Sequence, residues 1–370
     1  MCAKKYIYNS DNWPVLHFDE NEIRDVLSQV YYVHGRLFGR LDTLGFGVRD
    51  GLLLNAVSYE IVDSSAIEGE QINLRSVQSS VARRLGLDAA GAEWGFADHY
   101  TEGIIEMALD ATGNYHLPVT DDRLAGWHAA LFPTGRSGGY RISVAAYRTG
   151  DMQIVSGPVG KEKIHYVAPE PKRVPGEMES FLKWLEAEQG TDPFVKAAIA
   201  HLRFETIHPF DDGNGRIGRA LVDLLLSRAE KTTKRYYTLS SQLLKERNDY
   251  YKQLEAAQKY SGDVSNWIHW FLECLVRAME TSEKAIEKAR QKSKLFDNWR
   301  RIPMNERQLK MLNKLVEGFE GKLTTSKWGK LCKCSQDTAL RDIEDLIKKG
   351  ILKKSSEGGR STSYELVVLL

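Results

Sequence analysis

The sequence has few cysteines and no long apolar run. Four cysteines occur in 370 residues, and Cys332 and Cys334 stand too close together, with no histidine nearby, for an ordinary zinc site. We therefore expect free thiols. No stretch of about 18 apolar residues is present, and the first residues lack the apolar core of a secretory signal, so neither a membrane span nor export is expected. These absences favour a cytoplasmic protein.

The chain also lacks an overall excess of charge, internal repeats and low-complexity tracts. It has 51 basic and 50 acidic residues, and 42% of its residues are hydrophobic, which is typical of a globular protein. The length predicts two or three domains. The charge is uneven, because residues 301–370 contain 14 basic and 9 acidic residues. This local excess indicates an anionic partner for the C-terminal region.

A charged helix is predicted to end near Ser293, and residues 300–370 then have the pattern of a winged-helix domain. Helices are predicted at 305–316, 325–331 and 335–349, the third capped by Ser335, and a strand from Gly350 and a hairpin through residues 358–366 follow. The candidate contacts to phosphates or bases are Gln336, Thr338, Arg341, Lys353, Lys354 and Arg360. Duplex DNA is one candidate partner, and protein interaction or dimerisation is the alternative.

The most informative segment that the sequence does contain is HPFDDGNGRIGR, at residues 208–219. Asp192 and Pro193 begin a predicted helix that delivers His208 at its end. Apolar residues at helical spacing predict a second buried helix that starts at Asn214 or Gly215. The segment is therefore the loop between two buried helices.

The start of the second helix has the chemistry of a phosphate site. Gly213 and Gly215 can direct successive main-chain N–H groups into one concavity, where the helix dipole also favours an anion. Arg216 and Arg219 lie three residues apart, so they share a face of the helix, and their forked donors match phosphate oxygens. A di- or triphosphate is the expected ligand.

Two further residues of the segment supply catalytic chemistry. Asp212 is placed to hold a magnesium ion that bridges phosphates. His208 has an ordinary pKa of about 6.5, which suits a general base near neutral pH. A capped surface turn is the alternative, but it gives no reason for all these groups to occur together.

The segment resembles the signature of the Fic (filamentation induced by cAMP) family, HPFx(D/E)GNGRxxR, and matches every signature position. The resemblance implies a mainly α-helical protein with a Fic-type catalytic core at residues 96–292. It also implies that this core uses ATP and Mg²⁺ to transfer AMP to a serine, threonine or tyrosine hydroxyl of a protein.

The resemblance assigns a role to each residue of the loop. His208 would deprotonate the target hydroxyl, Asp212 would bind Mg²⁺, and Phe210 would fill the core beneath the loop. Asn214 and Arg216 would hold the α- and β-phosphates, with Arg219 on the γ-phosphate. The implied phosphate-binding segment comprises Gly213, Asn214, Gly215, Arg216, Ile217, Gly218 and Arg219.

A second match to the same family lies upstream, in the segment SSAIEG at residues 64–69. It resembles the inhibitory motif (S/T)xxxE(G/N), whose positions here are Ser64, Glu68 and Gly69. The resemblance implies that Glu68 contacts Arg219 in the place of the γ-phosphate, through a directional carboxylate–guanidinium pair. Gly69 also fits an ordinary helix C-terminus, which is compatible with this role.

The inhibitory segment falls within an N-terminal region, residues 1–95, that has the pattern of an all-helical bundle. It is diffusely similar to the extension that precedes some bacterial Fic proteins. Its expected role is to hold the inhibitory helix, residues 59–68, against the core.

The residues between the two motifs predict a β-hairpin. Alternating apolar residues run from residues 139–141 through 153–157 to 165–169, with a turn at 157–160. The hairpin resembles the family's flap, which accepts a target segment as an added strand and presents its hydroxyl to the base. The implied flap residues are Ile154, Val155, Ser156 and Gly157. A plain surface hairpin is the alternative.

Downstream of the loop, residues 246–254 resemble the helix that closes the adenine pocket in the family. Tyr250 or Tyr251 would pack on the purine, and core packing of one of them is the alternative. Gln258 stands where some relatives have an asparagine.

Other functions remain open from the sequence. The same loop could remove AMP from a modified protein, with water as the nucleophile, or transfer another group such as UMP or phosphocholine. From a different class, the chain could be a DNA-binding regulator whose core only senses nucleotide. The sequence does not determine whether the modified protein is a separate one or the chain itself, nor whether the chain forms a homodimer.

Overall fold

The computed structural model describes residues 6–87, 97–157, 161, 163–187, 190–259, 262–319, 321–355 and 362–367. The chain forms two compact units, Met1–Ile286 (unit 1) and Glu287–Leu370 (unit 2). The N-terminal helical region is thus not a body of its own, because its buried residues, such as Val30 and Ile61, belong to the same hydrophobic core as the rest of unit 1. Unit 2 begins before the boundary predicted at residue 300.

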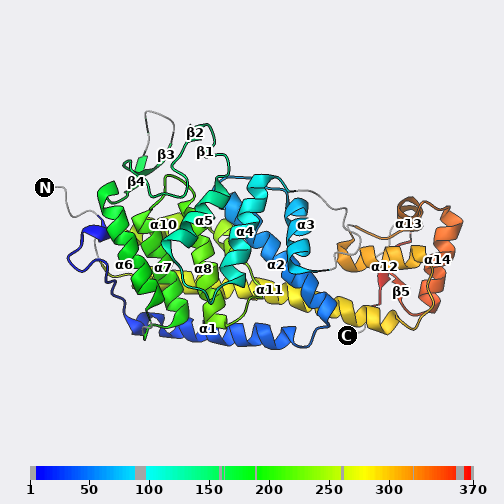
Figure 1. Cartoon of the computed structure of the whole chain (residues 1–370). Coiled ribbons are helices and arrows are strands. Elements are labelled where there is room, and N and C mark those ends of the chain that lie inside the picture. The colour runs from blue at the N-terminus through cyan, green and yellow to red at the C-terminus, as the bar shows by residue number, and fades with distance from the viewer. Residues whose placement is uncertain are drawn as a thin grey trace. The chain divides into compact units, whose positions relative to one another are not determined.

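Unit 1 is mainly helical, as the sequence predicts (Figure 1). Its first helices are α1 (Glu20–Leu41), α2 (Phe46–Ile67), α3 (Leu74–Leu85), α4 (His99–Gly113) and α5 (Asp121–Leu131). The later helices are α6 (Val174–Glu186), α7 (Pro193–Ile207), α8 (Asn214–Glu230), α9 (Leu239–Lys245), α10 (Arg247–Ala257) and α11 (Ser265–Trp299), whose end belongs to unit 2. Two short 3-10 helices are η1 (Ile7–Asn9) and η2 (Pro171–Arg173).

Helices α7 and α8 lie side by side in the middle of unit 1 (Figure 1). Their side chains are buried on nearly every side, as expected for helices at the centre of a core. Asp192 caps α7 by accepting hydrogen bonds from the N–H groups of Phe194 (2.9 Å) and Val195 (3.3 Å). Proline follows at the first helical position. Both helices begin where the sequence predicts.

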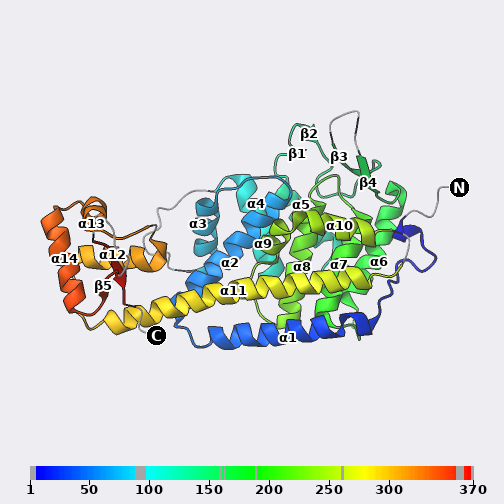
Figure 2. The same ribbon diagram turned by 180° about the vertical axis from the view of Figure 1, so that it is seen from behind.

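Helix α2 carries most of segment 64–69 at its end and packs on the core along its length. It packs against α9, where Glu60 accepts a hydrogen bond from the main-chain N–H of Ser240 (3.0 Å) and Asp63 accepts one from the Ser241 hydroxyl. On another side of unit 1, α1 runs beside α11 (Figure 2), and Arg36 donates to Glu283 across them (2.7 Å).

Two antiparallel hairpins lie at one edge of unit 1 (Figures 1 and 2). Strand β1 (Arg136–Ser137) pairs with β2 (Tyr140–Arg141), and β3 (Gln153–Ser156) pairs with β4 (Lys163–Val167). Residues 140–141 are therefore not part of the flap hairpin, because a tight turn at Gly138 (φ 52°) folds them back on β1. The predicted turn residues 158–160 lie outside the described residues.

Unit 2 has its elements in the order predicted for a winged helix. These are α12 (Glu306–Gly318), α13 (Thr325–Cys332), α14 (Gln336–Lys348), β5 (Leu352–Lys354) and β6 (Tyr364–Leu366), with the strands antiparallel. Ser335 caps α14, accepting the Thr338 N–H (3.2 Å). A separate hydrophobic core forms around Trp328 and Ile343. Residues 356–361 of the predicted wing, including Arg360, lie outside the described residues.

One predicted boundary in this region is wrong. The charged helix expected to end near Ser293 continues as α11 to Trp299. The reason is packing, since Leu295, Phe296 and Trp299 belong to the hydrophobic core of unit 2. These apolar side chains therefore keep the chain helical beyond Ser293.

Two of the expected absences can be compared with the described residues. Cys274, Cys332 and Cys334 are free thiols, as predicted, and Cys2 lies outside the described part of the chain. Within the described ranges, every helix is too short or too polar to cross a lipid bilayer.

Candidate active site

His208 stands at the end of α7 with a left-handed backbone conformation (φ 51°, ψ 63°), which is uncommon for a residue other than glycine. Its main-chain N–H donates the last helical hydrogen bond, to the Phe204 carbonyl (2.9 Å), and the chain then turns away from the helix axis. Burial, aided by the charge of Arg148, lowers the pKa of the His208 imidazole to about 4. The ring is therefore neutral at physiological pH, as a general base must be.

Arg148, which the sequence analysis missed, fixes the main chain around His208. Its buried guanidinium donates to the carbonyl groups of His208 (2.8 Å), Gly150 (3.0 Å) and Pro169 (2.6 Å). Its own N–H donates to the Pro209 carbonyl (2.9 Å). No sequence signal identifies this residue, because it lies 60 positions from His208 and outside any motif.

Replacing Arg148 by methionine is expected to lower the free energy of unfolding of unit 1 by on the order of 3 kcal/mol. The substitution keeps much of the side-chain volume but leaves three carbonyl groups, of which that of Pro169 is buried, without this donor. The urea midpoint of unfolding measures the effect, and Arg141→Met on the exposed strand β2 is the matched control. An unchanged midpoint for Arg148→Met would contradict the role given to this guanidinium.

A buried acid, Glu205, lies one turn before His208 on α7. Its Oε2 is 3.8 Å from His208 Nδ1, and its Oε1 has no hydrogen-bond partner among the described residues. Burial raises the pKa of the Glu205 carboxyl to about 8, the charge of Glu68 acts in the same direction, and Arg219 opposes both. Glu205 is therefore mostly uncharged at neutral pH, which removes a second negative charge from beside Glu68.

The loop after His208 is closed by the side chain of Asn214. Its Oδ1 accepts the Phe210 N–H (2.9 Å), and its Nδ2 donates to the Phe210 carbonyl (2.8 Å). The Phe210 ring is buried and stacks on His128 with 4.4 Å between ring centroids, in the core position that the sequence predicts. Because both polar atoms of the Asn214 amide are used in this way, its observed contacts shape the loop.

The two glycines of the loop place main chain where a side chain would not fit. Gly213 precedes α8 with φ 82°, and a Cβ atom there would lie 2.8 Å from the Phe132 ring. No side chain caps the start of α8, so its first N–H groups are available to an anion. A Cβ atom on Gly215 would lie 2.2 Å from Glu68 Oε1. A carboxylate thus sits directly against the start of this helix.

That carboxylate belongs to segment 64–69, at the end of α2. Glu68 Oε1 lies 2.8 Å from Arg219 Nη2. Ser64 binds the same guanidinium, with its hydroxyl accepting from Nε (2.9 Å) and its carbonyl from Nη2 (2.8 Å). Burial by itself lowers the pKa of Arg219, but the nearby Glu68 charge outweighs it and holds the pKa above its ordinary value. Gly69 follows with φ 85° and ends the helix.

The other motif arginine, Arg216, is also paired with a carboxylate, which the sequence analysis missed. Arg216 Nη1 lies 2.8 Å from Glu70 Oε2, and the Tyr100 hydroxyl of α4 contacts both groups. Glu70 lies two residues after Glu68, so one short segment neutralises both arginines. The sequence does carry a signal for the Glu70 contact, since the two acids of the segment EGE can reach two arginines. No sequence signal identifies Tyr100.

Asp212 lies at the edge of this cluster, with its side chain 41% exposed. One carboxylate oxygen accepts from the Ser137 hydroxyl and the other accepts the Gly213 N–H (2.6 Å). No group of three or more metal-type side chains occurs in the described ranges. A single exposed carboxylate suits Mg²⁺, which is commonly held by one or two protein carboxylates together with phosphates and water.

Ile217 and Gly218, the remaining residues of the implied phosphate-binding segment, face the protein interior. Ile217 is fully buried, and a Cβ atom on Gly218 would lie 2.6 Å from Glu205 Oε1. Both residues therefore support the packing of α8 rather than line the concavity at its start.

The two candidate adenine residues on α10 have different surroundings. Tyr250 is buried, and its hydroxyl lies 2.8 Å from His201 Nε2, which places it in the core. Tyr251 is 39% exposed, and its hydroxyl donates to the carbonyl of Ile67 (3.4 Å), the residue before Glu68. Gln258 donates to the Glu205 carbonyl (3.2 Å) and is buried. Of these side chains, Tyr251 is the one available to a purine.

The flap hairpin presents an apolar surface and is anchored near His208. Ile154 of β3 is half-buried, whereas Val155 and Ser156 of β3 and the following Gly157 are exposed. The strand pairing is irregular between Ile154 and Val155. At the other strand, the Tyr166 hydroxyl donates to the Thr206 carbonyl (2.6 Å), close to the end of α7.

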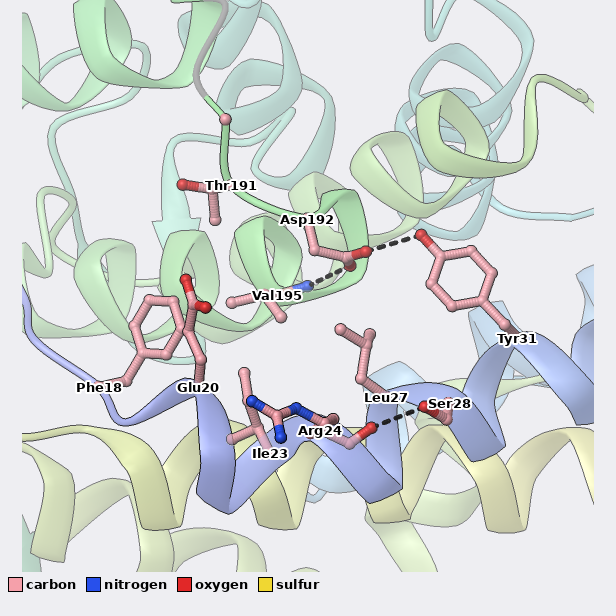
Figure 3. Close-up of a pocket in the computed structure, with 11 residues that line it drawn as sticks. Phe18, Glu20, Ile23, Arg24, Leu27, Ser28, Tyr31, Thr191, Asp192 and Val195 are labelled. Atoms are coloured by element: carbon pink, nitrogen blue, oxygen red, sulfur yellow. Dashed lines mark hydrogen bonds between the residues drawn. The ribbon is translucent and has the colours of Figure 1, made fainter.

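A pocket of about 610 Å³ lies elsewhere in unit 1, between the starts of α1 and α7 (Figure 3). Glu20, Arg24, Leu27 and Tyr31 line it from α1, and Asp192 and Val195 from α7. Asp192 is occupied in capping α7 and in accepting the Tyr31 hydroxyl (2.7 Å). The lining contains no residue of the 208–219 loop, so we do not place the active site here.

The candidate contacts of unit 2 do not form an all-basic face. On α14, exposed Arg341 lies among exposed Asp337 and Glu344, and on the hairpin Lys353 pairs with Glu365 (3.2 Å). Gln336 is exposed at the start of α14, Thr338 is half-buried, and Lys354 is exposed. This mixture of charges therefore favours neither duplex DNA nor a protein as the partner of unit 2.

Comparison with protein families gives two matching regions. Residues 118–226, which include the whole 208–219 loop, match the Fic/DOC family. Residues 6–87, which include Glu68, match a domain of unknown function (DUF4172). The 208–219 loop and segment 64–69 thus belong to two separately recognised sequence regions that fold into one unit.

Individual proteins give consistent similarities. A probable protein adenylyltransferase of Aquifex aeolicus is 39% identical over 80 residues, 22% of this chain and 23% of that protein. Protein adenylyltransferase Fic of Culex quinquefasciatus is 36% identical over 105 residues, 28% of this chain and 19% of that protein. The similarity thus spans less than a quarter of the length of either relative.

The fold is similar to that of solved structures. A Fic family protein from Desulfovibrio desulfuricans G20 superposes with a TM-score of 0.56 at 18% identity, over 96% of this chain and 98% of that one. A Fic domain containing signaling protein from Bacteroides thetaiotaomicron gives a TM-score of 0.50 at 18% identity, over 72% of this chain and 98% of that one.

Proposed function

Because this chain is a Fic family protein with its Fic/DOC region at residues 118–226, we propose that it transfers AMP from ATP to a hydroxyl group of a protein. The observation that carries the proposal is the contact of the Glu68 carboxylate with Arg219 and with the start of α8. A carboxylate from a distant segment occupies a site whose main chain and arginine are arranged for an anion. The family relationship indicates that this anion is a triphosphate.

Each step of the transfer has a residue suited to it. Neutral His208 accepts the proton of the target hydroxyl as that oxygen attacks the α-phosphorus. The first N–H groups of α8 and the Arg216 and Arg219 guanidinium groups bind the phosphates and the charge that develops on them. Asn214 and Arg148 hold the loop in place, and Tyr251 covers the purine.

Asp212 would hold Mg²⁺, which when bound neutralises phosphate charge and orients the leaving pyrophosphate. Its exposure and its single carboxylate are suited to an ion shared with the nucleotide. The Ser137 hydroxyl holds this carboxylate in place.

The same proposal includes autoinhibition by the segment that follows α2. Glu68 binds Arg219 and Glu70 binds Arg216, so neither guanidinium is free for phosphate. The triphosphate must displace these carboxylates to bind productively. Serine, threonine or tyrosine hydroxyls are the proposed acceptors, presented by a target strand added to the flap.

The reaction type is tested by following the two ends of ATP separately in the Glu68→Gly variant. Label on the α-phosphate is expected to become bound to protein, and label on the γ-phosphate is expected to leave with pyrophosphate. Protein-bound γ-label would overturn AMP transfer in favour of phosphorylation. AMP release from a pre-modified protein, without transfer from ATP, would favour the reverse reaction.

A further inference from the structure

Ser156, His165 and Glu255 form a hydrogen-bonded array on the flap. Ser156 Oγ lies 2.6 Å from His165 Nε2, and His165 Nδ1 lies 2.9 Å from Glu255 Oε2. The three residues come from β3, β4 and α10. Their meeting is therefore a product of the fold and not of neighbouring positions in the sequence.

The order of the groups is the one that activates a hydroxyl. When the Glu255 carboxylate accepts the proton on Nδ1, the lone pair of a neutral imidazole is on Nε2, which faces the Ser156 hydroxyl. A nucleophile within hydrogen-bond reach of a base, with the base oriented by a carboxylate, is the arrangement of serine-based catalysis. The hydrogen bond with His165 also lowers the pKa of the Glu255 carboxyl, which favours its ionised form.

The elements that carry the array also carry residues that contact the surroundings of the candidate active site. Glu255 lies four residues after Tyr251 on α10, so both share one face of that helix. Tyr166, next to His165 in β4, binds the Thr206 carbonyl two residues before His208. The flap and α10 accordingly lie close together in Figure 1. The Ser156 side chain is exposed, so its hydroxyl is accessible to a donor.

We propose that Ser156 is a residue on which this protein modifies itself, accepting AMP with His165 as the base and Glu255 orienting the imidazole. This inference rests on the proposed AMP transfer. As the Ser156 oxygen bonds to the α-phosphorus of ATP, its proton passes to His165 Nε2. The bond from that phosphorus to the oxygen bridging the β-phosphate breaks, and pyrophosphate leaves. His165 then releases its proton to water, and AMP remains as a phosphodiester on the serine.

The experiment uses the full-length Glu68→Gly protein with Mg²⁺ and ATP, and locates AMP on its peptides by mass spectrometry over time. AMP is expected on Ser156, and Ser156→Ala should lower total self-labelling at least about tenfold. His165→Gln, which keeps a polar side chain but removes the base, should slow labelling of Ser156 by about 10²-fold. Glu255→Gln should slow it by a smaller factor, since it only orients the base.

The matched control is Ser28→Ala on α1, because Ser28 is an exposed serine whose hydroxyl donates to the Arg24 carbonyl (2.9 Å) and has no histidine partner. It should leave self-labelling unchanged. AMP on other residues or on an added protein, with none on Ser156, would overturn this inference while leaving AMP transfer intact. Equal labelling of Ser156 in the wild-type array and in both array variants would overturn the role of His165 and Glu255. No protein-bound AMP in any sample would overturn both proposals.

Discussion

His208→Ala is expected to lose about 10³-fold in the rate of AMP transfer, within the range that general bases contribute. His208 is the one histidine of the 208–219 loop, and Arg148 and Asn214 hold that loop in one conformation. Its lowered pKa keeps the ring neutral, so the rate should not depend on deprotonating it between pH 6 and pH 8. The rate is measured from label transferred from the α-phosphate of ATP to an added protein in the Glu68→Gly background.

The matched control for this variant is His116→Ala, which removes an exposed histidine of unit 1. ATP affinity should change little in His208→Ala, because the base contacts the acceptor hydroxyl and not the phosphates. A transfer rate within a factor of two of the parent would refute the assignment of His208 as the base.

Glu68→Gly is expected to raise the rate of AMP transfer at least about tenfold, equivalent to about 1.4 kcal/mol of removed competition. The change frees the Arg219 guanidinium and clears the space against Gly215. Removing the charge of Glu68 should also lower the pKa of Glu205 from about 8, because Arg219 would then face that carboxyl alone. The measurements are initial transfer rate and ATP affinity at fixed Mg²⁺.

Glu68→Gln supplies the comparison within the same site, because it keeps the side-chain volume but not the charge. Its rate should lie between those of the wild type and Glu68→Gly. Since Glu70 still binds Arg216 in both variants, Glu68→Gly should gain further from Glu70→Gln. Unchanged ATP affinity and unchanged turnover in Glu68→Gly, with the fold intact by circular dichroism, would remove the basis for autoinhibition.

Local features of the fold were predictable because their causes are local. Asp192 and Pro193 define the start of α7, Gly213 defines the start of α8, and Ser335 defines that of α14. The resemblance of two short segments to family motifs also anticipated the Glu68–Arg219 contact, although the segments lie far apart in the chain.

Contacts between distant segments without a motif were not predictable. Arg148 and Tyr100 reach the loop only because the tertiary fold brings them there, and nothing in their own neighbourhoods marks them. The choice between Tyr250 and Tyr251 had a usable signal, since Tyr250, Leu254 and Ala257 share the buried face of α10 at helical spacing. The end of α11 was misplaced because its last turns pack in a different core.

The most direct test of an autoinhibited AMP transferase compares wild type, Glu68→Gly and Glu68→Gly/His208→Ala in one assay with ATP labelled on the α-phosphate. We predict weak labelling of an added protein by the wild type, strong labelling by Glu68→Gly, and none above background by the double variant. Equal labelling of the added protein by all three, or none by Glu68→Gly despite measurable ATP binding, would contradict the account.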